Sequence, residues 1–509
     1  MTSEVFSGPA TGGGFLLVLA ICLPTAGMLL SLALGGRLAV RAALVLLPVG
    51  LGVAIAIAAW MWRTREPLVY YIGGWAPPLG LALRADGLSA AMLATTAIVI
   101  CATGLYGRAA FRMPAGASEG RAPLVFWVLL MAIWAAMNLV FLGDDLFNLY
   151  VALELLTFAA VPLVCLDGRA ETLAAALRYL LFALLGSVLY LLGTALLYGG
   201  YGSLDIALLF GLVRAEPVAF IAVGLMTAGL LAKTALFPLH LWLPPAHAGA
   251  PPAASAMLSG LVVKASFFLV IRLWFDVMPG LLNLVAAQVL SSLGAGAIVV
   301  GSVLALRQPR LKLLIAYSTI AQIGYLFLMF PLAAGSASGP LVSNVALTGG
   351  MLQAISHAFA KAAMFMSAGL IAEALGHDRI AGLRGVGQMR PITVFAFGVA
   401  ALSLVGLPLS GGFVAKWLLL TAAMTAGQWW WALVMVLGGL LAGGYMFRVL
   451  APALADADQP LVPRTPVARS RELIVLALAL CSVLLGLLPL RPLGLLQIGR
   501  PNVSGASSR

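Results

Sequence analysis

Cysteine and charge are both scarce in this chain. Only four cysteines occur among 509 residues, scattered singly through apolar runs, and no Cys-x-x-Cys pair or Cys/His cluster accompanies them. The sequence therefore predicts no metal site, no redox centre and no cofactor of its own. Charged residues make up only 9% of the chain, and no polar stretch is long enough to fold as a separate soluble domain. Whatever the protein does is therefore expected to happen inside a membrane or at its faces.

Apolar residues dominate what is present. They make up 62% of the chain, and the mean hydropathy is +1.08. A soluble domain cannot bury that much apolar surface, so the composition predicts an all-α polytopic membrane protein. Hydropathy indicates about fourteen transmembrane helices, each of roughly 20 residues or more. Their predicted limits are 14–34, 42–62, 87–106, 123–142, 146–166, 173–198, 217–243, 253–275, 282–306, 312–332, 343–373, 392–426, 429–450 and 473–490.

The positive charge of the chain is distributed as in a membrane protein. The formal net charge is +12, and 24 of the 29 basic residues are arginines in loops, in tails or near span ends. The loops on one side carry about 17 basic residues, while the loops and tails on the other carry about 8. By the positive-inside rule the richer side is cytoplasmic, so both termini are predicted to face outward. The basicity thus orients the protein and does not indicate nucleic-acid binding.

The lysines are placed differently from the arginines. Four of the five lysines lie inside predicted spans, namely Lys233, Lys264, Lys361 and Lys416. Glu154 is the only one of the 17 acidic residues placed well within a span. A charge at the centre of a membrane helix costs at least about 2.5–3.5 kcal/mol, so five such groups require a reason.

Three explanations are open for these groups. A lysine can extend along its helix to the lipid headgroups, although Lys264 lies about 11 residues, or roughly 16 Å, from either end of its span. A fixed ion pair, for example Glu154 with Lys233, is the second explanation. The third is proton transfer, because desolvation lowers the pKa of a lysine and a nearby carboxylate raises it again. Arginine stays protonated, so arginine at the edges and lysine in the middle favours the third explanation.

Two segments interrupt predicted helices at membrane depth. "LAKTALFPLHLWLPPAHAGAPP" contains Lys233, and "GLPLSGGFVAKW" contains Lys416. Such breaks are tolerated in a membrane only where the loosened backbone faces protein or water. Two interrupted helices, each with a lysine beside the break and five spans apart, predict an inverted-repeat transporter. The predicted break residues are Pro238, Pro408, Gly411 and Gly412.

Histidines add further titratable groups. His357 and Lys361 are four residues apart and therefore share one helix face. His240 and His247 flank "LWLPPA" after the seventh span. A histidine that titrates near neutrality suits a proton relay, whereas the alternative for His240 and His247 is hydrogen bonding to loose carbonyls at the helix break.

Five ordered motifs carry a resemblance through nearly the whole chain. They are "DGLSA" at 86–90, "GDDLFNLYVALEL" at 143–155, "FPLHLWLPPAH" at 237–247, "HAFAKAAMF" at 357–365 and "GLPLSGGFVAKW" at 406–417. In these motifs the chain resembles the proton-conducting antiporter-like membrane subunits. That family includes subunits of respiratory complex I, of membrane-bound hydrogenases and of Mrp-type cation/proton antiporters. The second motif and the fourteen-span length look most like the Mrp D subunit.

The resemblance implies a fold and a set of site residues. The fold is two inverted five-helix repeats, spans 4–8 and 9–13, with spans 7 and 12 broken. It divides the single membrane domain, 1–509, into an N-terminal three-helix part at 1–121, repeats at 122–275 and 276–450, and a C-terminal helix and tail at 451–509. The implied proton pathway is Glu154, Lys233, Lys264, His357, Lys361 and Lys416, with His240, His247 and Asp145 as further candidates.

Four functions compete on this reading. The first is the proton-translocating subunit of a multi-subunit cation/proton antiporter, with other membrane subunits as partners and sodium, if transported, crossing elsewhere. The second is a proton-pumping subunit of a complex I-like NADH:quinone oxidoreductase or membrane-bound hydrogenase. The third is a stand-alone solute transporter, and the fourth is a structural subunit. The chain shows no catalytic centre of its own, and the expected location is the bacterial inner membrane.

Overall fold

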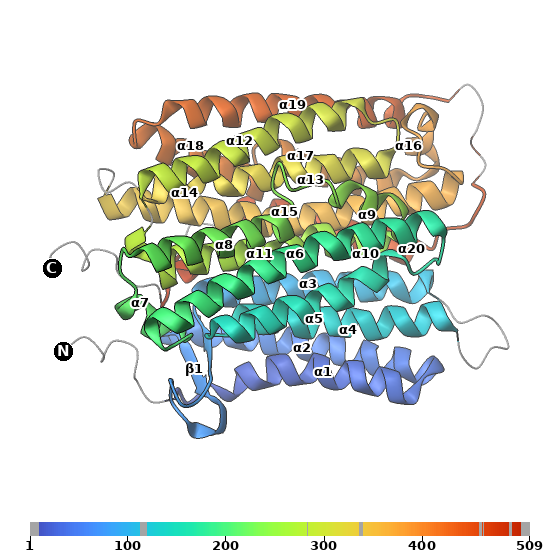
Figure 1. The fold of residues 1–509 in the computed structure, drawn as a ribbon. Coiled ribbons are helices and arrows are strands. Elements are labelled where there is room, and N and C mark those ends of the chain that lie inside the picture. The colour runs from blue at the N-terminus through green and yellow to red at the C-terminus, as the bar shows by residue number, and fades with distance from the viewer. Residues whose placement is uncertain are drawn as a thin grey trace.

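The computed structural model describes residues 10–111, 120–281, 283–334, 339–457, 461, 463–487 and 491–499. Its long helices run side by side in one bundle, with α1 (Phe15–Leu34) and α2 (Gly36–Thr64) at one edge and α19 (Trp429–Leu454) at the other (Figure 1). Within these residues, thirteen helices are long and apolar enough to cross a membrane. Two shorter apolar helices, α17 (Pro391–Val405) and α18 (Gly411–Thr425), together supply a fourteenth crossing. The prediction of an all-α membrane protein with about fourteen spans is confirmed.

The N-terminal part contains three spans and a short hairpin. The two strands pair antiparallel, with Leu68 opposite Ala85, and Asp86 then caps the third span by accepting a hydrogen bond from Ser89 N. Hydropathy gives no signal for this hairpin, because it is short and lies between two spans. We call the end of the bundle where it lies the hairpin end. The elements are α1 (Phe15–Leu34), α2 (Gly36–Thr64), β1 (Leu68–Tyr71), β2 (Ala82–Ala85) and α3 (Gly87–Ala110).

The first repeat follows as five spans. Its fourth span is broken into α8 and α9, and its fifth alternates α-helix with π-helical turns at Leu258–Val262 and Arg272–Val277. The elements are α4 (Arg121–Leu142), α5 (Leu146–Val164), α6 (Ala170–Tyr201), the short α7 (Ile206–Leu212), α8 (Pro217–Thr234), α9 (Leu243–Gly249), α10 (Pro252–Met257) and α11 (Val263–Ile271).

The second repeat has the same order of spans, and its fourth span is again broken, here into α17 and α18. One further span, α20, packs against it at the end of the chain. The elements are α12 (Leu284–Arg307), α13 (Leu311–Phe327), α14 (Met329–Ala334), α15 (Gly339–Leu375), the short α16 (Val386–Met389), α17 (Pro391–Val405), α18 (Gly411–Thr425), α19 (Trp429–Leu454) and α20 (Arg469–Leu487).

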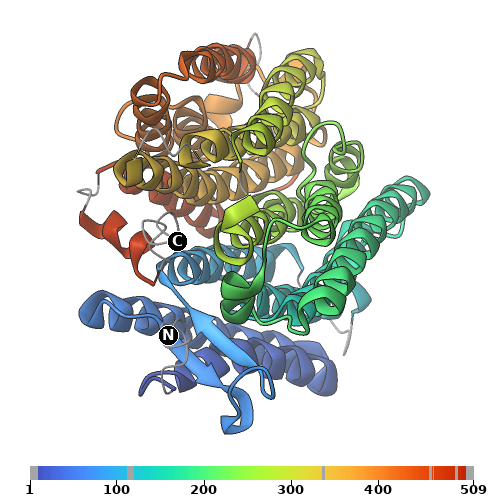
Figure 2. The same ribbon diagram turned by 60° about the vertical axis from the view of Figure 1, so that its left-hand side comes forward.

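The two repeats run in opposite directions through the membrane. Each repeat has an odd number of spans, so the second begins on the side opposite to the first. Figure 2 shows the first repeat in cyan and green beside the second in yellow and orange. The predicted inverted repeats with broken spans 7 and 12 are therefore confirmed.

Glycine pairs bring neighbouring spans into backbone contact. A Cβ on Gly186 of α6 would lie 2.6 Å from the carbonyl oxygen of Gly229 on α8. In the second repeat, a Cβ on Gly294 of α12 would lie 2.7 Å from the carbonyl oxygen of Gly324 on α13. Small residues allow this close packing, which is typical of helix pairs in membranes.

Both ends of the described chain meet at the hairpin end. Thr11 N donates to Val69 O at 3.0 Å, and Gly87 N donates to Ile498 O at 2.9 Å. The Arg84 side chain donates to Gly499 O at 2.9 Å. The two ends therefore lie on the same side of the membrane, as an even number of crossings requires.

Candidate functional site

The buried lysines come from both repeats. Lys264 and Lys361 have no exposed surface, and Lys233 is 7% exposed. Lys416 is half-buried. A side chain without exposed surface does not reach a lipid headgroup, so extension to the interface does not explain Lys264 or Lys361.

Glu154 and Lys233 form an ion pair between α5 and α8. Lys233 Nζ lies 3.3 Å from Glu154 Oε1 and donates to Thr157 Oγ1 at 3.0 Å. Ser187 on α6 donates its hydroxyl proton to the same carboxylate oxygen. Because Gly186 lets α6 approach α8 closely, three helices converge on this pair. The carboxylate therefore has both a cation and a neutral donor as partners.

The break after α8 fixes the position of Lys233. The helix ends at Thr234, and Ala235 adopts a left-handed conformation with φ +58°. Trp242, beyond the break, donates its indole N–H to Ala232 O at 2.9 Å. This bond and those of the Ala235 and Leu236 N–H groups satisfy carbonyls that the ended helix would otherwise leave unpaired. Lys233 thus lies in the last turn of α8, beside the interruption.

Lys264 lies two residues after the end of a π-helical turn. Its ammonium group donates to the carbonyl oxygen of Ser259, five residues earlier, within the turn Leu258–Val262. Such turns loosen the regular hydrogen bonding of a helix and often occur at functional sites. Lys264 has no acidic partner among the residues that the structure describes.

Lys361 and His357 occupy adjacent turns of α15. Lys361 Nζ donates to Ile315 O at 2.9 Å and to the hydroxyl of Ser318, both on α13. His357 is 1% exposed, and neither of its ring nitrogens has a hydrogen-bond partner in the described structure. The predicted shared face is therefore present, with its cation bound by neutral oxygens.

Lys416 lies beside the second break. Its ammonium group donates to Leu404 O at 2.7 Å and to Val405 O at 3.1 Å. These carbonyls end α17, where the helix dipole is negative and favours a cation. The nitrogen also lies 4.4 Å from the centre of the Tyr325 ring, an arrangement that attracts a cation to the ring face.

Hydroxyl groups lie near the buried lysines. Thr234, next to Lys233, donates to Ser266 at 2.9 Å, and Ser266 is two residues after Lys264. A small cavity lined by Lys233, Ser266, Thr157 and Tyr179 adjoins this step.

Similar steps continue through the second repeat. The hydroxyls of Ser259 and Thr319 share a hydrogen bond of 2.8 Å, and Thr319 follows the serine that binds Lys361. Ser356 and Ser403 share another of 2.8 Å, which links α15 to α17 just before the second break. The sequence gives no signal for these hydroxyls, because serine and threonine in apolar helices commonly bond to their own backbone.

Two further histidines, His240 and His247, lie around the first break. His247, in α9, is fully buried without a partner for either ring nitrogen in the described chain, and it stacks on Phe365 of α15 at 4.5 Å. His240 is 5% exposed, and its Nδ1 has no partner there either. Hydrogen bonding to loose carbonyls therefore does not account for His247, whose place in a proton pathway stays a prediction.

Asp145 is accounted for as a helix cap. Its carboxylate accepts hydrogen bonds from Phe147 N at 3.0 Å and Asn148 N at 2.9 Å, at the start of α5. Such a cap satisfies otherwise unpaired N–H groups and complements the helix dipole. This places Asp145 at the hairpin end, among structural contacts, and its place in a proton pathway also stays a prediction.

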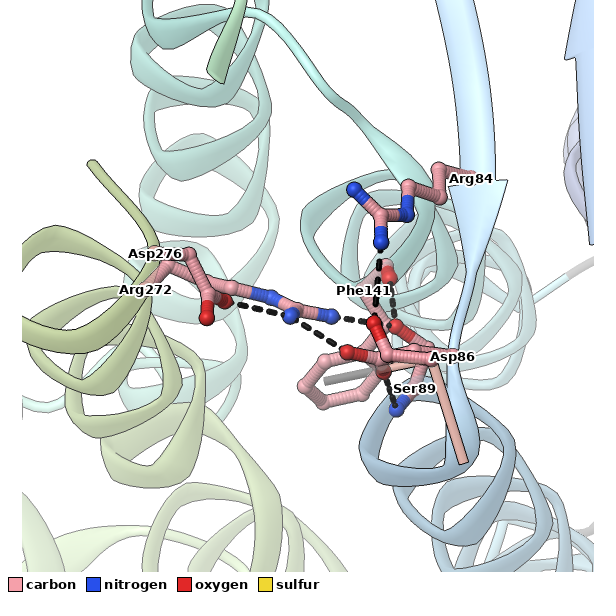
Figure 3. A network of polar contacts seen from close by, with 7 residues as sticks. Arg84, Asp86, Ser89, Phe141, Arg272 and Asp276 are labelled. Atoms are coloured by element: carbon pink, nitrogen blue, oxygen red, sulfur yellow. Dashed lines mark hydrogen bonds and ion pairs between the residues drawn. The ribbon is translucent and has the colours of Figure 1, made fainter. Parts of the chain in front are cut away.

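An arginine–aspartate network at the hairpin end was not found from the sequence. Arg272 Nη1 lies 2.5 Å from Asp86 Oδ2 and 2.6 Å from Asp276 Oδ2, and Nη2 donates to Ser89 Oγ at 2.9 Å (Figure 3). Burial alone would raise the pKa of Asp86, but Arg272 and the Ser89 N–H lower it to about 2. The sequence signals are an arginine near the end of the eighth span and the motif "DGLSA", which contains Asp86 and Ser89.

Comparisons with known proteins agree with this geometry. A family model described as NADH:quinone oxidoreductase/Mrp antiporter, transmembrane, matches residues 143–442. The chain is 34% identical over 449 residues to the NADH-quinone oxidoreductase subunit N of Desulforudis audaxviator, covering 83% of this chain and 85% of that one.

Solved structures share the fold over nearly the whole chain. A chain of the Mrp complex from Dietzia sp. superposes with a TM-score of 0.84 at 25% identity, covering 95% of this chain and 96% of that one. A chain of an archaeal membrane-bound sulfane sulfur reductase gives 0.83 at 26% identity, covering 94% and 96%. With its broken spans and its match over most of the membrane domain, the chain belongs to the NADH:quinone oxidoreductase/Mrp antiporter transmembrane family.

Proposed function

We propose that this chain translocates protons as one subunit of a multi-subunit complex in a bacterial cell membrane. The observation that carries the proposal is the Glu154–Lys233 pair and its continuation, through hydroxyl groups, toward Lys264, Lys361 and Lys416. A fixed ion pair would account for Lys233 alone. It leaves the three other buried lysines without a reason, whereas proton transfer gives all of them one.

Proton movement would follow from opening and closing the ion pair. A lysine beside a carboxylate keeps its proton, whereas a lysine left alone in an apolar interior tends to release it. When Glu154 withdraws, the Lys233 proton would pass by way of Thr234 and Ser266 toward Lys264. From there the Ser259–Thr319 and Ser356–Ser403 hydroxyl pairs lead to the lysines of the second repeat. Each transfer returns a lysine to its neutral state and readies it for the next proton.

Two assemblies suit such a subunit. The superposition with a chain of the Mrp complex supports a cation/proton antiporter. The 34% identity to a NADH-quinone oxidoreductase subunit supports a redox-driven pump. In both assemblies, the partners of this chain would be the other membrane subunits. The basic loops opposite the hairpin end would face the cytoplasm, and both termini would lie outside.

Purification of the tagged complex from its native membrane tests the proposal. Identification of the co-purifying subunits separates an antiporter assembly from one with redox subunits. The complex is then reconstituted into vesicles, and proton uptake is followed with a sodium gradient or with NADH and a quinone. Proton uptake under one of these drives, abolished by Lys264→Met in an assembled complex, supports the function. Uptake that is normal in the assembled variant would refute it.

A further inference from the structure

Asp144 occupies an unusual position at the hairpin end. It lies between α4 and α5, is 8% exposed, and its main-chain oxygen accepts from Ile206 N at 2.9 Å. Within the part of the chain that the structure describes, its carboxylate makes neither a hydrogen bond nor an ion pair. A buried carboxylate without a partner is costly unless it is protonated. The main chain of Asp144 is therefore bonded to the start of α7, whereas its carboxylate has no bonded partner among the described residues.

The Asp144 carboxylate lines a small cavity. The polar walls are Arg84 from β2 and Arg272 and Asp276 from the end of the eighth span, with Ile206, Ala207, Phe210 and Gly499 completing it. Arg272 is held in place by Asp86, Asp276 and Ser89, so this wall is rigid (Figure 3). The cavity thus combines a fixed cation with one unpaired carboxylate.

Charged groups of both signs, from β2, the start of α7 and the end of the eighth span, act on Asp144. Burial raises the pKa of Asp144, Arg84 and Arg272 lower it, and Asp205 and Asp276 raise it, with the result at about 7. Tyr71 on β1 also interacts with this carboxylate. A carboxyl group in these surroundings changes its protonation near neutral pH, unlike Asp86 close by.

We propose that Asp144 is a proton-exchange site at the hairpin end, where its carboxyl group gives a proton to water in the cavity and takes one back. In the exchange, the O–H bond of the carboxylic acid breaks, water becomes hydronium, and the carboxylate stays between Arg84 and Arg272. The inference deepens the proposed function and rests on it, because a translocating subunit needs such a group where protons meet the aqueous phase. Lys264 lies eight residues before Arg272 on the same span.

Infrared difference spectroscopy of the purified complex tests the site without requiring transport. A protonated carboxyl group has its own carbonyl stretch, which is followed while pH is raised from about 5 to about 9, around the pKa of about 7. We expect a titrating band in the wild type that is lost in Asp144→Asn. The matched control, Asp145→Asn, keeps the helix cap and removes the neighbouring carboxylate, so the band is expected to remain. A band that persists unchanged in Asp144→Asn overturns the inference.

Proton flux in reconstituted vesicles gives the second readout. Asp144→Asn is expected to slow proton translocation and to remove the change of rate near pH 7 on the hairpin side. Asp144→Glu, which still titrates, is expected to restore both. A translocating Asp144→Asn complex with the wild-type pH profile overturns the inference and leaves the proposed function intact. Absence of translocation in the wild type, with the Asp144 band present, refutes the proposed function instead.

Discussion

The two repeats bind their lysines in different ways. In the first repeat, Lys233 has a carboxylate partner, Glu154, at 3.3 Å. In the second repeat, Lys361 is bound by a carbonyl and a hydroxyl, and Lys416 by two carbonyls and the face of an aromatic ring. The two repeats share the same broken span, but they neutralise the charge of their buried lysines to different degrees. The first half holds one full countercharge, at Lys233, whereas Lys264 of the same half and the lysines of the second half are bound only by dipoles and an aromatic ring.

This difference assigns different work to the two halves. A carboxylate stabilises a lysine charge strongly and can be moved away, so the first repeat can switch between two states. Carbonyls and ring faces stabilise the charge more weakly and are part of the helices, so in the proposed function the second repeat would hold a proton only transiently. The first half would therefore gate proton movement, and the second would conduct it.

The largest effect is expected at Lys264, where the halves meet. Lys264→Met keeps a flexible side chain of similar length but removes the titrating nitrogen, so the complex should assemble and lose translocation by at least about 100-fold. Lys264→His should recover part of the rate, because histidine also titrates. Assembly is measured by co-purification, and flux is measured in vesicles.

Lys264→Arg supplies the contrary test. Arginine retains the charge but does not release its proton. Normal flux in the assembled arginine variant would show that Lys264 is not a proton carrier. Failed assembly of Lys264→Met together with full function of Lys264→Arg would show a fixed structural charge.

The second largest effect is expected at the Glu154–Lys233 ion pair, which only the first repeat contains among the described residues. Glu154→Gln leaves Lys233 buried without its counterion, which should destabilise the protein by up to about 3–5 kcal/mol and abolish coupling. Adding Lys233→Met should recover much of the stability but none of the flux. Thermal unfolding of the two single variants and the double variant measures the interaction. If the double variant is no more stable than Glu154→Gln, the pair is not energetically coupled and the contrast between repeats fails.

A smaller effect is expected when the distance between α6 and α8, the helices beside the Glu154–Lys233 pair, is increased. Gly186→Ala places a methyl group against the Gly229 carbonyl, so α6 and α8 should separate and the protein lose about 1–3 kcal/mol. Gly294→Ala is the matched control, since it creates a similar clash with Gly324 in the second repeat, away from the ion pair. Both variants should be less stable, but only Gly186→Ala should reduce flux beyond its loss of stability. Equal flux in the two variants would contradict a gating role for the first repeat.

The smallest effect is expected at the aromatic ring beside Lys416. Tyr325→Leu removes a cation–ring interaction of about 0.5–2 kcal/mol and should slow translocation a few-fold. Tyr325→Phe keeps the ring and should retain most of the rate, although it loses the hydrogen bond to Met435 O. Vesicle flux compares the two, and equal losses would assign the effect to that hydrogen bond instead.

The spans and the breaks were predictable because each is encoded locally. Runs of about 20 apolar residues identify the spans, and Pro238 and Pro408 lie inside the two observed interruptions. The helix face shared by His357 and Lys361 follows from their spacing alone. The possible pairing of Glu154 with Lys233 followed from scarcity, since only one acid lies well inside a span.

The partners of the other lysines were not predictable in this way. Tyr325 is far from Lys416 in sequence, and aromatic residues are frequent throughout the spans. The π-helical turn that presents Ser259 O to Lys264 has no sequence signature. The ion pair between Asp86 and Arg272 joins residues 186 positions apart. Each depends on how distant helices pack, which hydropathy does not report.

The hairpin end also constrains how the protein is made. Arg84 donates to Gly499 O, a contact across 415 positions, and Gly87 N donates to Ile498 O. Because a chain emerges from the ribosome from its N-terminus onward, the first spans enter the membrane long before residues 491–499 exist. The walls around Asp144 therefore close only after the last span has been inserted. A chain truncated before residue 498 would lack this closure, so the site becomes complete only after α20 and the residues that follow it have been made.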